Sequence, residues 1–219
     1  MEFMLQCAEL VGTIAFALSG ALLAIEKRLD IFGILLLSIV TALGGGTIRD
    51  LLLGITPPKM FYSYQYLALA AAAALITFLA ARRSRGIFGR FQSLMDALFV
   101  FSDALGLGIF AVIGTEAGLA AGYGDNPFLC IFLGMTTGVG GGILRDIMCG
   151  DIPFVLRKHI YAVAAIAGGL VFYVLIRTGL DGTLAALAGV VVTVALRLLA
   201  WHYRWNLPRV QVPEEEKTI

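Results

Sequence analysis

The sequence predicts an all-α integral membrane protein with seven transmembrane helices, six of which form a 3+3 inverted repeat. Three observations lead to this fold class. The 219 residues are 59% hydrophobic and 14% charged, and their mean hydropathy of +0.91 exceeds that of domains with a polar surface. Apolar stretches long enough to span a bilayer follow one another along almost the whole chain. The glycine-rich stretch 44–57 occurs a second time, slightly altered, at 140–153.

Seven windows are long and apolar enough to cross a membrane, and short connections with glycine, proline or charged residues separate them. In chain order they are Cys7–Ile25, Ile31–Leu53, Tyr66–Ala81, Leu94–Gly118, Pro127–Cys149, Ile160–Ile176 and Thr183–Trp201. We expect a single transmembrane domain over residues 1–206 and a polar C-terminal tail at 207–219. The N-terminal stretch lacks the basic start and cleavage site of a signal peptide, so its helix should be retained.

The basic residues are distributed unequally between the two sides that seven spans define. One side has only Lys59 and Arg177, whereas the other has eleven: Lys27, Arg28, Arg82, Arg83, Arg85, Arg90, Arg157, Lys158, Arg204, Arg209 and Lys217. Loops rich in lysine and arginine stay on the cytoplasmic side of a membrane. The count therefore predicts an N-terminus outside and a cytoplasmic C-terminus.

An internal repeat relates the first three helices to the next three. A shift of 96 residues gives seven identities in fourteen positions, because Gly44, Gly45, Gly46, Arg49, Asp50, Gly54 and Pro57 fall on Gly140, Gly141, Gly142, Arg145, Asp146, Gly150 and Pro153. A shift of 94 places Glu9, Gly12, Phe16, Ala17 and Gly20 on Asp103, Gly106, Phe110, Ala111 and Gly114. The repeats cover about residues 5–82 and 94–177, and the seventh helix covers about 183–201. Three spans are an odd number, so the copies have opposite orientations, as in many transport proteins.

Three consecutive glycines lie inside the second helix of each repeat, at Gly44–Gly46 and Gly140–Gly142. Glycine lacks the Cβ atom that favours helix, so we expect helices two and five to be kinked or unwound there. Unpaired backbone groups persist within a membrane only where protein or water satisfies them, and the helix ends would direct carbonyl oxygens at a polar pathway that attracts cations. Close packing of helices through small residues is the alternative interpretation.

Two arginines, Arg49 and Arg145, lie well inside predicted spans, where a charged side chain is rare without a partner or a function. Adjacent residues point about 100 degrees apart on a helix, so Arg49 is not expected to pair with Asp50. The repeat instead suggests Glu9 as the partner of Arg49 and Asp103 as the partner of Arg145.

The aspartates after these arginines, Asp50 and Asp146, either cap exposed N–H groups or face the pathway. We therefore assign the ion pathway, as lining or gate, to residues shared by both repeats. They are Gly44, Gly45, Gly46, Arg49 and Asp50 in the first, and Gly140, Gly141, Gly142, Arg145 and Asp146 in the second.

Other classes of function find no support in the sequence. The chain has no arrangement of Ser/His/Asp, HExxH or paired carboxylates, and "GVGGGILRD" lacks the lysine of a nucleotide-binding loop, so we do not expect an enzyme. Cys7, Cys130 and Cys149 are too scattered for a disulfide framework or a metal site. A net charge of +1 gives no reason to expect nucleic acid as a partner. A purely structural membrane protein remains an alternative.

Two GGG-x-x-RD motifs, Gly44–Asp50 and Gly140–Asp146, in a seven-span chain with an inverted repeat resemble the prokaryotic members of the trimeric intracellular cation (TRIC) channel family. The resemblance covers about residues 5–203. It implies a homotrimer in a prokaryotic cell (inner) membrane, with membrane lipid as its other partner. Each subunit would have its own pore, lined by helices two and five and favouring potassium. No cofactor is implied beyond potassium or sodium as the permeant ion.

The same domain is associated with glycine transport in some bacterial relatives, so a secondary transporter of a small zwitterion is the alternative function. In that case Arg49 or Arg145 would hold a carboxylate, and the carbonyl ends of the helices would hold an ammonium group. The sequence leaves both alternatives open.

Overall fold

The computed structural model describes residues 2–83, 92–157 and 160–205, and all regular elements within them are helical. They are α1 (Glu2–Glu26), α2 (Ile31–Leu52), the 3-10 helix η1 (Lys59–Phe61), α3 (Tyr64–Arg83), α5 (Gln92–Gly118), the π-helical turn η2 (Leu119–Tyr123), α6 (Pro127–Met148), α7 (Phe154–Arg157), α8 (Ala162–Arg177) and α9 (Gly182–His202). The predicted tail, 207–219, and several of the basic residues lie outside the described residues.

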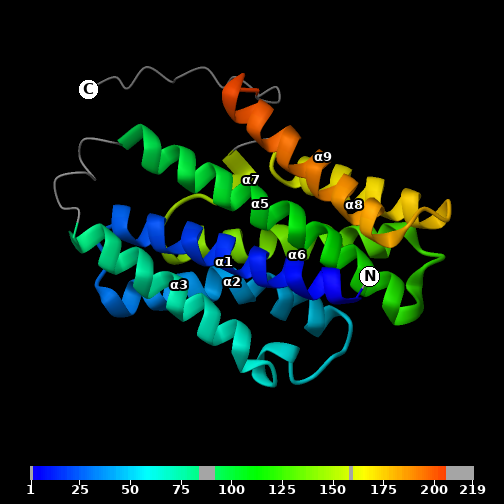
Figure 1. The fold of residues 1–219 in the computed structure, drawn as a ribbon, viewed down its shortest axis with the longest axis horizontal. Helices are drawn as coiled ribbons and strands as arrows, with labels where there is room; N and C mark the ends of the chain where they lie inside the picture. The colour runs from blue at the N-terminus through cyan, green and yellow to red at the C-terminus, as the bar shows by residue number, and fades with distance from the viewer. Residues whose placement is uncertain (1, 84–91, 158–159, 206–219) are drawn as a thin grey trace, which may run out of the picture.

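Within the described part, six helices are long and apolar enough to cross a membrane: α1, α2, α3, α5 continued by η2, α6 and α9. The seventh apolar helix, α8, is shorter, with 16 residues. These seven follow the predicted order, and the predicted all-helical fold class is confirmed. In Figure 1, α1 runs from the right of the view to the left, and α9 also runs from the right toward the upper left, the shared direction that an odd number of spans requires of the first and last helix.

Polar caps and glycines set the ends of these helices. Asp30 accepts a hydrogen bond from the Gly33 N–H at 2.8 Å at the start of α2, and Asn126 accepts one from the Leu129 N–H at 3.0 Å at the start of α6. Gly54 and Gly150 follow α2 and α6 with φ of 72° and 71°. Glycine adopts this left-handed conformation without steric strain, which explains why both repeats have a glycine there.

Four helices, α1, α2, α5 and α6, form the centre of the bundle, and the remaining ones lie on its flanks (Figure 1). The third helix, α3, packs on α1 and α2, while α8 and α9 pack on each other and on α5. Phe16 and Phe110, which correspond under the repeat, stack at the centre with ring centroids 5.4 Å apart. The core therefore carries the symmetry that the sequence repeat predicts.

The helices α2 and α6 are continuous through their glycine triplets, so the expected interruptions with free carbonyl oxygens are wrong. The glycines serve close packing instead. A Cβ atom on Gly45 would overlap the carbonyl oxygen of Thr137, and one on Gly141 would overlap the carbonyl oxygen of Thr41. Two helices can approach this closely only where neither has a side chain, which is the packing role that was the alternative interpretation.

Candidate functional site

A polar cavity of about 130 Å³ lies in the first repeat, in the half of the bundle where α1 begins. We call it the first-repeat cavity. It brings together polar residues from four elements and reaches Gly46 of the first triplet. Its polar lining includes Glu9 and Thr13 of α1, Thr47, Arg49 and Asp50 of α2, Lys59 of η1 and Tyr66 of α3.

Within this cavity, Arg49 pairs with its sequence neighbour. Its Nε and Nη2 donate to Asp50 Oδ1 at 3.0 and 2.8 Å, contrary to the prediction that Asp50 would be out of reach. The arginine side chain is long enough to fold back over the last turn of the helix. The structure does not bring Arg49 within ion-pair distance of Glu9, which accepts a hydrogen bond from the Tyr66 hydroxyl at 2.8 Å. Tyr66 thus occupies the carboxylate that was expected to bind Arg49.

The corresponding position in the second repeat is a buried cluster of charges, here called the second-repeat ion cluster. Its centre is Arg145, whose Nη1 donates to Asp103 Oδ1 at 2.6 Å and to the Ser19 hydroxyl at 2.5 Å. Arg145 Nε also donates to Asp146 Oδ1 at 2.9 Å. The structure therefore brings together Arg145 and Asp103, the pair that the repeat suggested.

Two further residues complete this cluster. The Tyr161 hydroxyl donates to Asp103 Oδ1 at 3.3 Å, and Arg197 Nη2 of α9 lies 3.6 Å from Asp103 Oδ2. The Arg197 guanidinium also lies over the Tyr161 ring, 4.6 Å from its centroid. Asp103 therefore has four partners, Ser19, Arg145, Tyr161 and Arg197, and the last of them comes from a helix outside the repeat.

Neither Tyr161 nor Arg197 is among the site residues expected from the sequence. A shift of 95 places Tyr66 on Tyr161, and each tyrosine donates to the acid of its own repeat. Arg197 stands alone within an apolar span, which was a usable signal because intramembrane charges are rare. Its partner, however, could not be read from a repeat to which it does not belong.

The two aspartates bind the backbone that follows their helices. Asp50 Oδ2 accepts from the Lys59 N–H at 2.8 Å, and Asp146 Oδ2 accepts from the Phe154 N–H at 2.8 Å. The N–H groups are those of the next segment, not those of a broken helix. Each aspartate therefore joins its arginine to the returning chain, and this explains the Arg-Asp pair in both repeats.

Two aromatic rings cover the second-repeat ion cluster on the side of Arg145. The Arg145 guanidinium carbon lies 4.9 Å from the Phe99 ring centroid and 5.5 Å from that of Phe154. Three buried polar atoms in the cluster have no hydrogen-bond partner among the described residues: Asp103 Oδ2, Arg145 Nη2 and Arg197 Nε. Buried polar atoms are nearly always hydrogen-bonded, so this arrangement is only partly satisfied.

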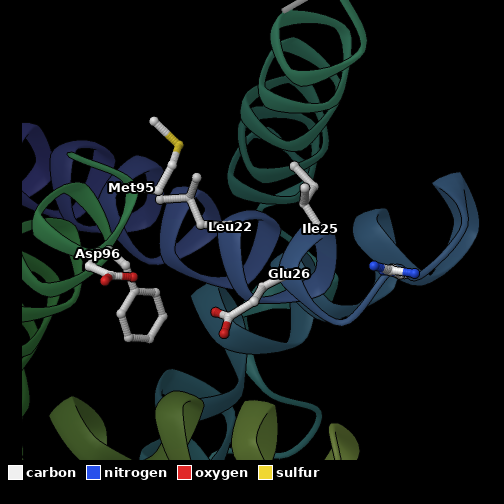
Figure 2. A pocket seen from close by; sticks show the side chains of 7 residues that line it. Leu22, Ile25, Glu26, Met95 and Asp96 are labelled. Carbon is white, nitrogen blue, oxygen red and sulfur yellow. The ribbon is translucent and has the colours of Figure 1, made fainter. Parts of the chain in front are cut away.

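A second hollow, of about 330 Å³, lies beyond the rings at the end of the bundle where α1 ends. We call it the vestibule. Figure 2 shows Glu26 of α1 and Asp96 of α5 on the two helices that border it, with Leu22, Ile25 and Met95 nearby. Phe99 also lines it, so the ring that covers Arg145 is a wall of the vestibule.

The sequence is similar to bacterial membrane proteins over nearly its whole length. The profile of the family described as "Glycine transporter" matches residues 6–82 and 100–177. The UPF0126 membrane protein of Vibrio cholerae is 38% identical over 94% of this chain and 82% of that protein. The inner membrane protein YadS of Escherichia coli K12 is also 38% identical, over 94% of this chain and 96% of that protein.

Solved structures of the same fold are similar as well. A structure described as the basis for conductance through TRIC cation channels superposes with a TM-score of 0.82 at 34% identity, covering 96% of this chain and 98% of that one. The TRIC orthologue from Rhodobacter sphaeroides superposes with a TM-score of 0.81 at 35% identity, covering 92% and 98%.

Proposed function

The chain belongs to the trimeric intracellular cation (TRIC) channel family, and from this premise we propose that it is a potassium-favouring channel with one conduction path through each subunit. Its relatives are cation channels and bacterial membrane proteins by name, and it shares their fold. The proposal extends to a homotrimer in a prokaryotic inner membrane. The unequal distribution of basic residues supports an outside N-terminus and a cytoplasmic C-terminus.

One observation carries the proposed path: polar features follow one another along the glycine crossing of α2 and α6. Gly46 lines the first-repeat cavity, and a Cβ atom on Gly142 would lie 2.9 Å from the Tyr161 hydroxyl and 3.6 Å from Arg145 Nη2. The vestibule begins behind Phe99. Because a polar group inside a membrane persists only where it is paired or hydrated, such a series favours an ion path over a purely structural bundle.

In this proposal the glycines contribute by lacking side chains, and their carbonyl oxygens remain in the helices. Gly44–Gly46 and Gly140–Gly142 allow the polar groups of both repeats to approach the centre of the subunit. Arg49 and Asp50 line the first-repeat cavity, while Arg145 and Asp146 belong to the second-repeat ion cluster, which acts as the gate. In the lining of the vestibule the carboxylates of Glu26 and Asp96 outnumber the one basic group, Arg28, and this would favour cations over anions at that mouth.

The second-repeat ion cluster is the proposed gate, here in its closed state. The Arg145 guanidinium lies against Phe99 and Phe154 and separates the vestibule from the centre. Opening requires Arg145 to leave Asp103 and the two rings. Three buried polar atoms of the cluster form no hydrogen bond with the described residues, although Arg145 Nη2 lies 2.9 Å from Asp146 Oδ1 and Asp103 Oδ2 lies 3.6 Å from Arg197 Nη2 as ion pairs. A partly satisfied buried network is weaker than a complete one, and this lowers the free energy that holds the cluster together.

A secondary transporter of a small zwitterion is the second candidate. The first-repeat cavity supports it, since the basic Arg49 and Lys59 and the acidic Glu9 and Asp50 balance in a space of about 130 Å³. The name of the matching family profile points the same way. A zwitterion needs one group of each sign, and this cavity provides both.

Potassium flux and glycine uptake measured in the same proteoliposomes separate the two functions. We expect single-channel currents whose reversal potential follows the potassium gradient and not the chloride gradient. Asp103→Asn should raise the open probability, and Arg177→Gln, at an exposed ion pair with Asp125, should leave it unchanged. Saturable, gradient-coupled glycine uptake without conductance would overturn the channel proposal.

A further inference from the structure

A groove lined by apolar side chains and two arginines lies among α1, α2 and α3, at the end of the bundle where α1 ends. Its volume is about 1080 Å³, and its apolar lining includes Ile25, Leu29, Ile34 and Phe78. Arg28 and Arg82, both exposed, line the same groove. Side chains of both kinds therefore face one space at the edge of the predicted membrane-spanning region.

The backbone at Arg28 adopts a conformation that favours glycine. Its φ is 58°, and the Arg28 N–H donates to the Ile25 carbonyl while the Leu29 N–H donates to the Ala24 carbonyl, closing the end of α1. The other left-handed positions among the described residues are four glycines, Gly54, Gly122, Gly150 and Gly179, and one further arginine, Arg204. An arginine is strained in this conformation, whereas glycine adopts it freely.

Within the described residues no ion pair involves Arg28 or Arg82. Two acids are equally near to Arg28 in sequence. Asp30 accepts from the Gly33 N–H as the cap of α2, and Glu26 lines the vestibule together with Arg28 but forms no ion pair with it. The neighbouring Lys27 differs, because it donates to Asp151 Oδ1 at 2.7 Å, and this hydrogen bond raises the pKa of Lys27. The turn thus commits one cation to the protein and leaves the next one available.

We infer that this groove binds one anionic phospholipid, with the phosphate held between Arg28 and Arg82 and an acyl chain along Ile34 and Phe78. Charge complementarity supports the headgroup, since two unpaired guanidinium groups at a membrane surface attract anionic lipid. The apolar lining supports a lipid over free phosphate, because free phosphate has no acyl chain to contact these apolar side chains. Ile76 and Leu79 of α3 are exposed as well, so part of this helix beside the groove is also apolar and uncovered within the subunit.

Native mass spectrometry of the full chain in detergent tests this inference, with dioleoyl phosphatidylglycerol and dioleoyl phosphatidylcholine as probes. We expect the phosphatidylglycerol to bind the wild type more tightly than the phosphatidylcholine. The double variant Arg28→Gly, Arg82→Gln should weaken phosphatidylglycerol binding by about tenfold to thirtyfold, the effect of two basic side chains near an anionic surface. Inorganic phosphate at millimolar concentration should not displace the lipid.

The single variant Arg28→Gly separates binding from folding. Glycine relieves the strained backbone, so the thermal midpoint without lipid should be unchanged or higher, while binding of phosphatidylglycerol is reduced. Arg177→Gln is the matched control, because Arg177 is an exposed arginine at the end of α8 and does not line the groove. It should bind phosphatidylglycerol as the wild type does.

Three results would overturn the inference. The double variant could bind phosphatidylglycerol with wild-type affinity, or phosphatidylcholine could bind as tightly as phosphatidylglycerol. Displacement by inorganic phosphate would assign the arginines to a free anion. A changed number of subunits in the double variant, with lipid binding intact, would assign the groove to a contact between copies of the chain. The test reads lipid binding alone, so it is independent of whether the protein conducts.

Discussion

The two repeats place four corresponding polar residues in different surroundings. Glu9, Arg49, Asp50 and Tyr66 border the first-repeat cavity, whereas Asp103, Arg145, Asp146 and Tyr161 form the buried second-repeat ion cluster. The hydrogen bonds from tyrosine to acid and from the next segment's N–H to aspartate are the same in both. What differs is whether the arginine binds the acid of its repeat.

Neighbours outside the shared set account for this difference. The residue whose N–H binds the aspartate is Lys59 in the first repeat and Phe154 in the second, and the position of Phe99 corresponds to Leu5 under the shift of 94. Arg197, from the helix without a counterpart, adds a second cation to Asp103. Corresponding polar groups thus border a cavity in the first repeat and form a buried cluster in the second, according to the aromatic and charged side chains around them.

The largest effect expected is at the glycine crossing that both halves share. Gly45→Ala or Gly141→Ala places a methyl group on a carbonyl oxygen of the facing helix, and should destabilise the fold by about 2–3 kcal/mol or more. Thermal unfolding in detergent measures the loss. Gly46→Ala is the matched control from the same triplet, because its Cβ would lie 3.7 Å from Arg49 Nη2; it should be neutral or stabilising by up to about 1 kcal/mol. Equal loss in both variants would contradict close packing as the role of Gly45.

Neutralising the two acids of the repeat should give unequal results. Asp103→Asn leaves Arg145 and Arg197 buried with one acid, Asp146, and we expect a loss of roughly 3–5 kcal/mol in the closed state. Glu9→Gln removes a charge that forms no ion pair within the described residues and leaves Tyr66 an amide oxygen as acceptor, so it should cost no more than about 1 kcal/mol. The measurement is the thermal midpoint of both variants in the same detergent. Similar losses would show that the two halves are more alike than the contacts indicate.

Exchanging the residues that distinguish the halves tests the gate directly. Phe154→Lys should loosen the packing on Arg145 and raise the open probability, and Lys59→Phe should narrow the first-repeat cavity and lower the unitary conductance. We expect changes of a few-fold, corresponding to about 1 kcal/mol. Planar bilayer recording measures both quantities. If Phe154→Lys left gating unchanged, the ring would have no part in closure.

The smallest effects should come from the tyrosine hydroxyls. Tyr66→Phe and Tyr161→Phe each remove one hydrogen bond to the acid of a repeat, worth about 1 kcal/mol on average. The loss at Tyr161 should be the larger, because Asp103 is buried and its other oxygen already lacks a hydrogen-bond partner. Urea or thermal unfolding of the two variants measures the difference. A larger loss of stability at Tyr66 than at Tyr161 would contradict the prediction that the hydrogen bond to the more deeply buried acid contributes more.

The pairing of charges shows how far the repeat could be used for prediction. It suggested both acid–arginine pairs by the same argument, yet only Asp103 and Arg145 meet. In the first repeat Arg49 turns to Asp50 and Tyr66 binds Glu9. A repeat aligns residues, but the choice among several partners within reach depends on side chains from other helices. Arg197 is such a side chain, and nothing in the repeat pointed to it.

The glycine triplets show a second limit. Three consecutive glycines predicted a kinked or unwound segment in α2 and in α6. In the structure these segments are where the two helices cross. Glycine permits both an interrupted helix and a close helix contact, since each depends on the missing Cβ atom. Only the position of the facing carbonyl oxygens, on Thr41 and Thr137, distinguishes these outcomes.

The sequence by itself determined the membrane class, the order of the seven apolar helices and the inverted repeat, because hydropathy and internal similarity are local properties of the chain. The tertiary structure alone decided that α2 and α6 continue through their glycines, that one half is open and the other closed, and that α9 contributes a charge. These features depend on contacts between residues distant in the chain. Which of several possible partners a side chain binds depends on how the helices pack around it.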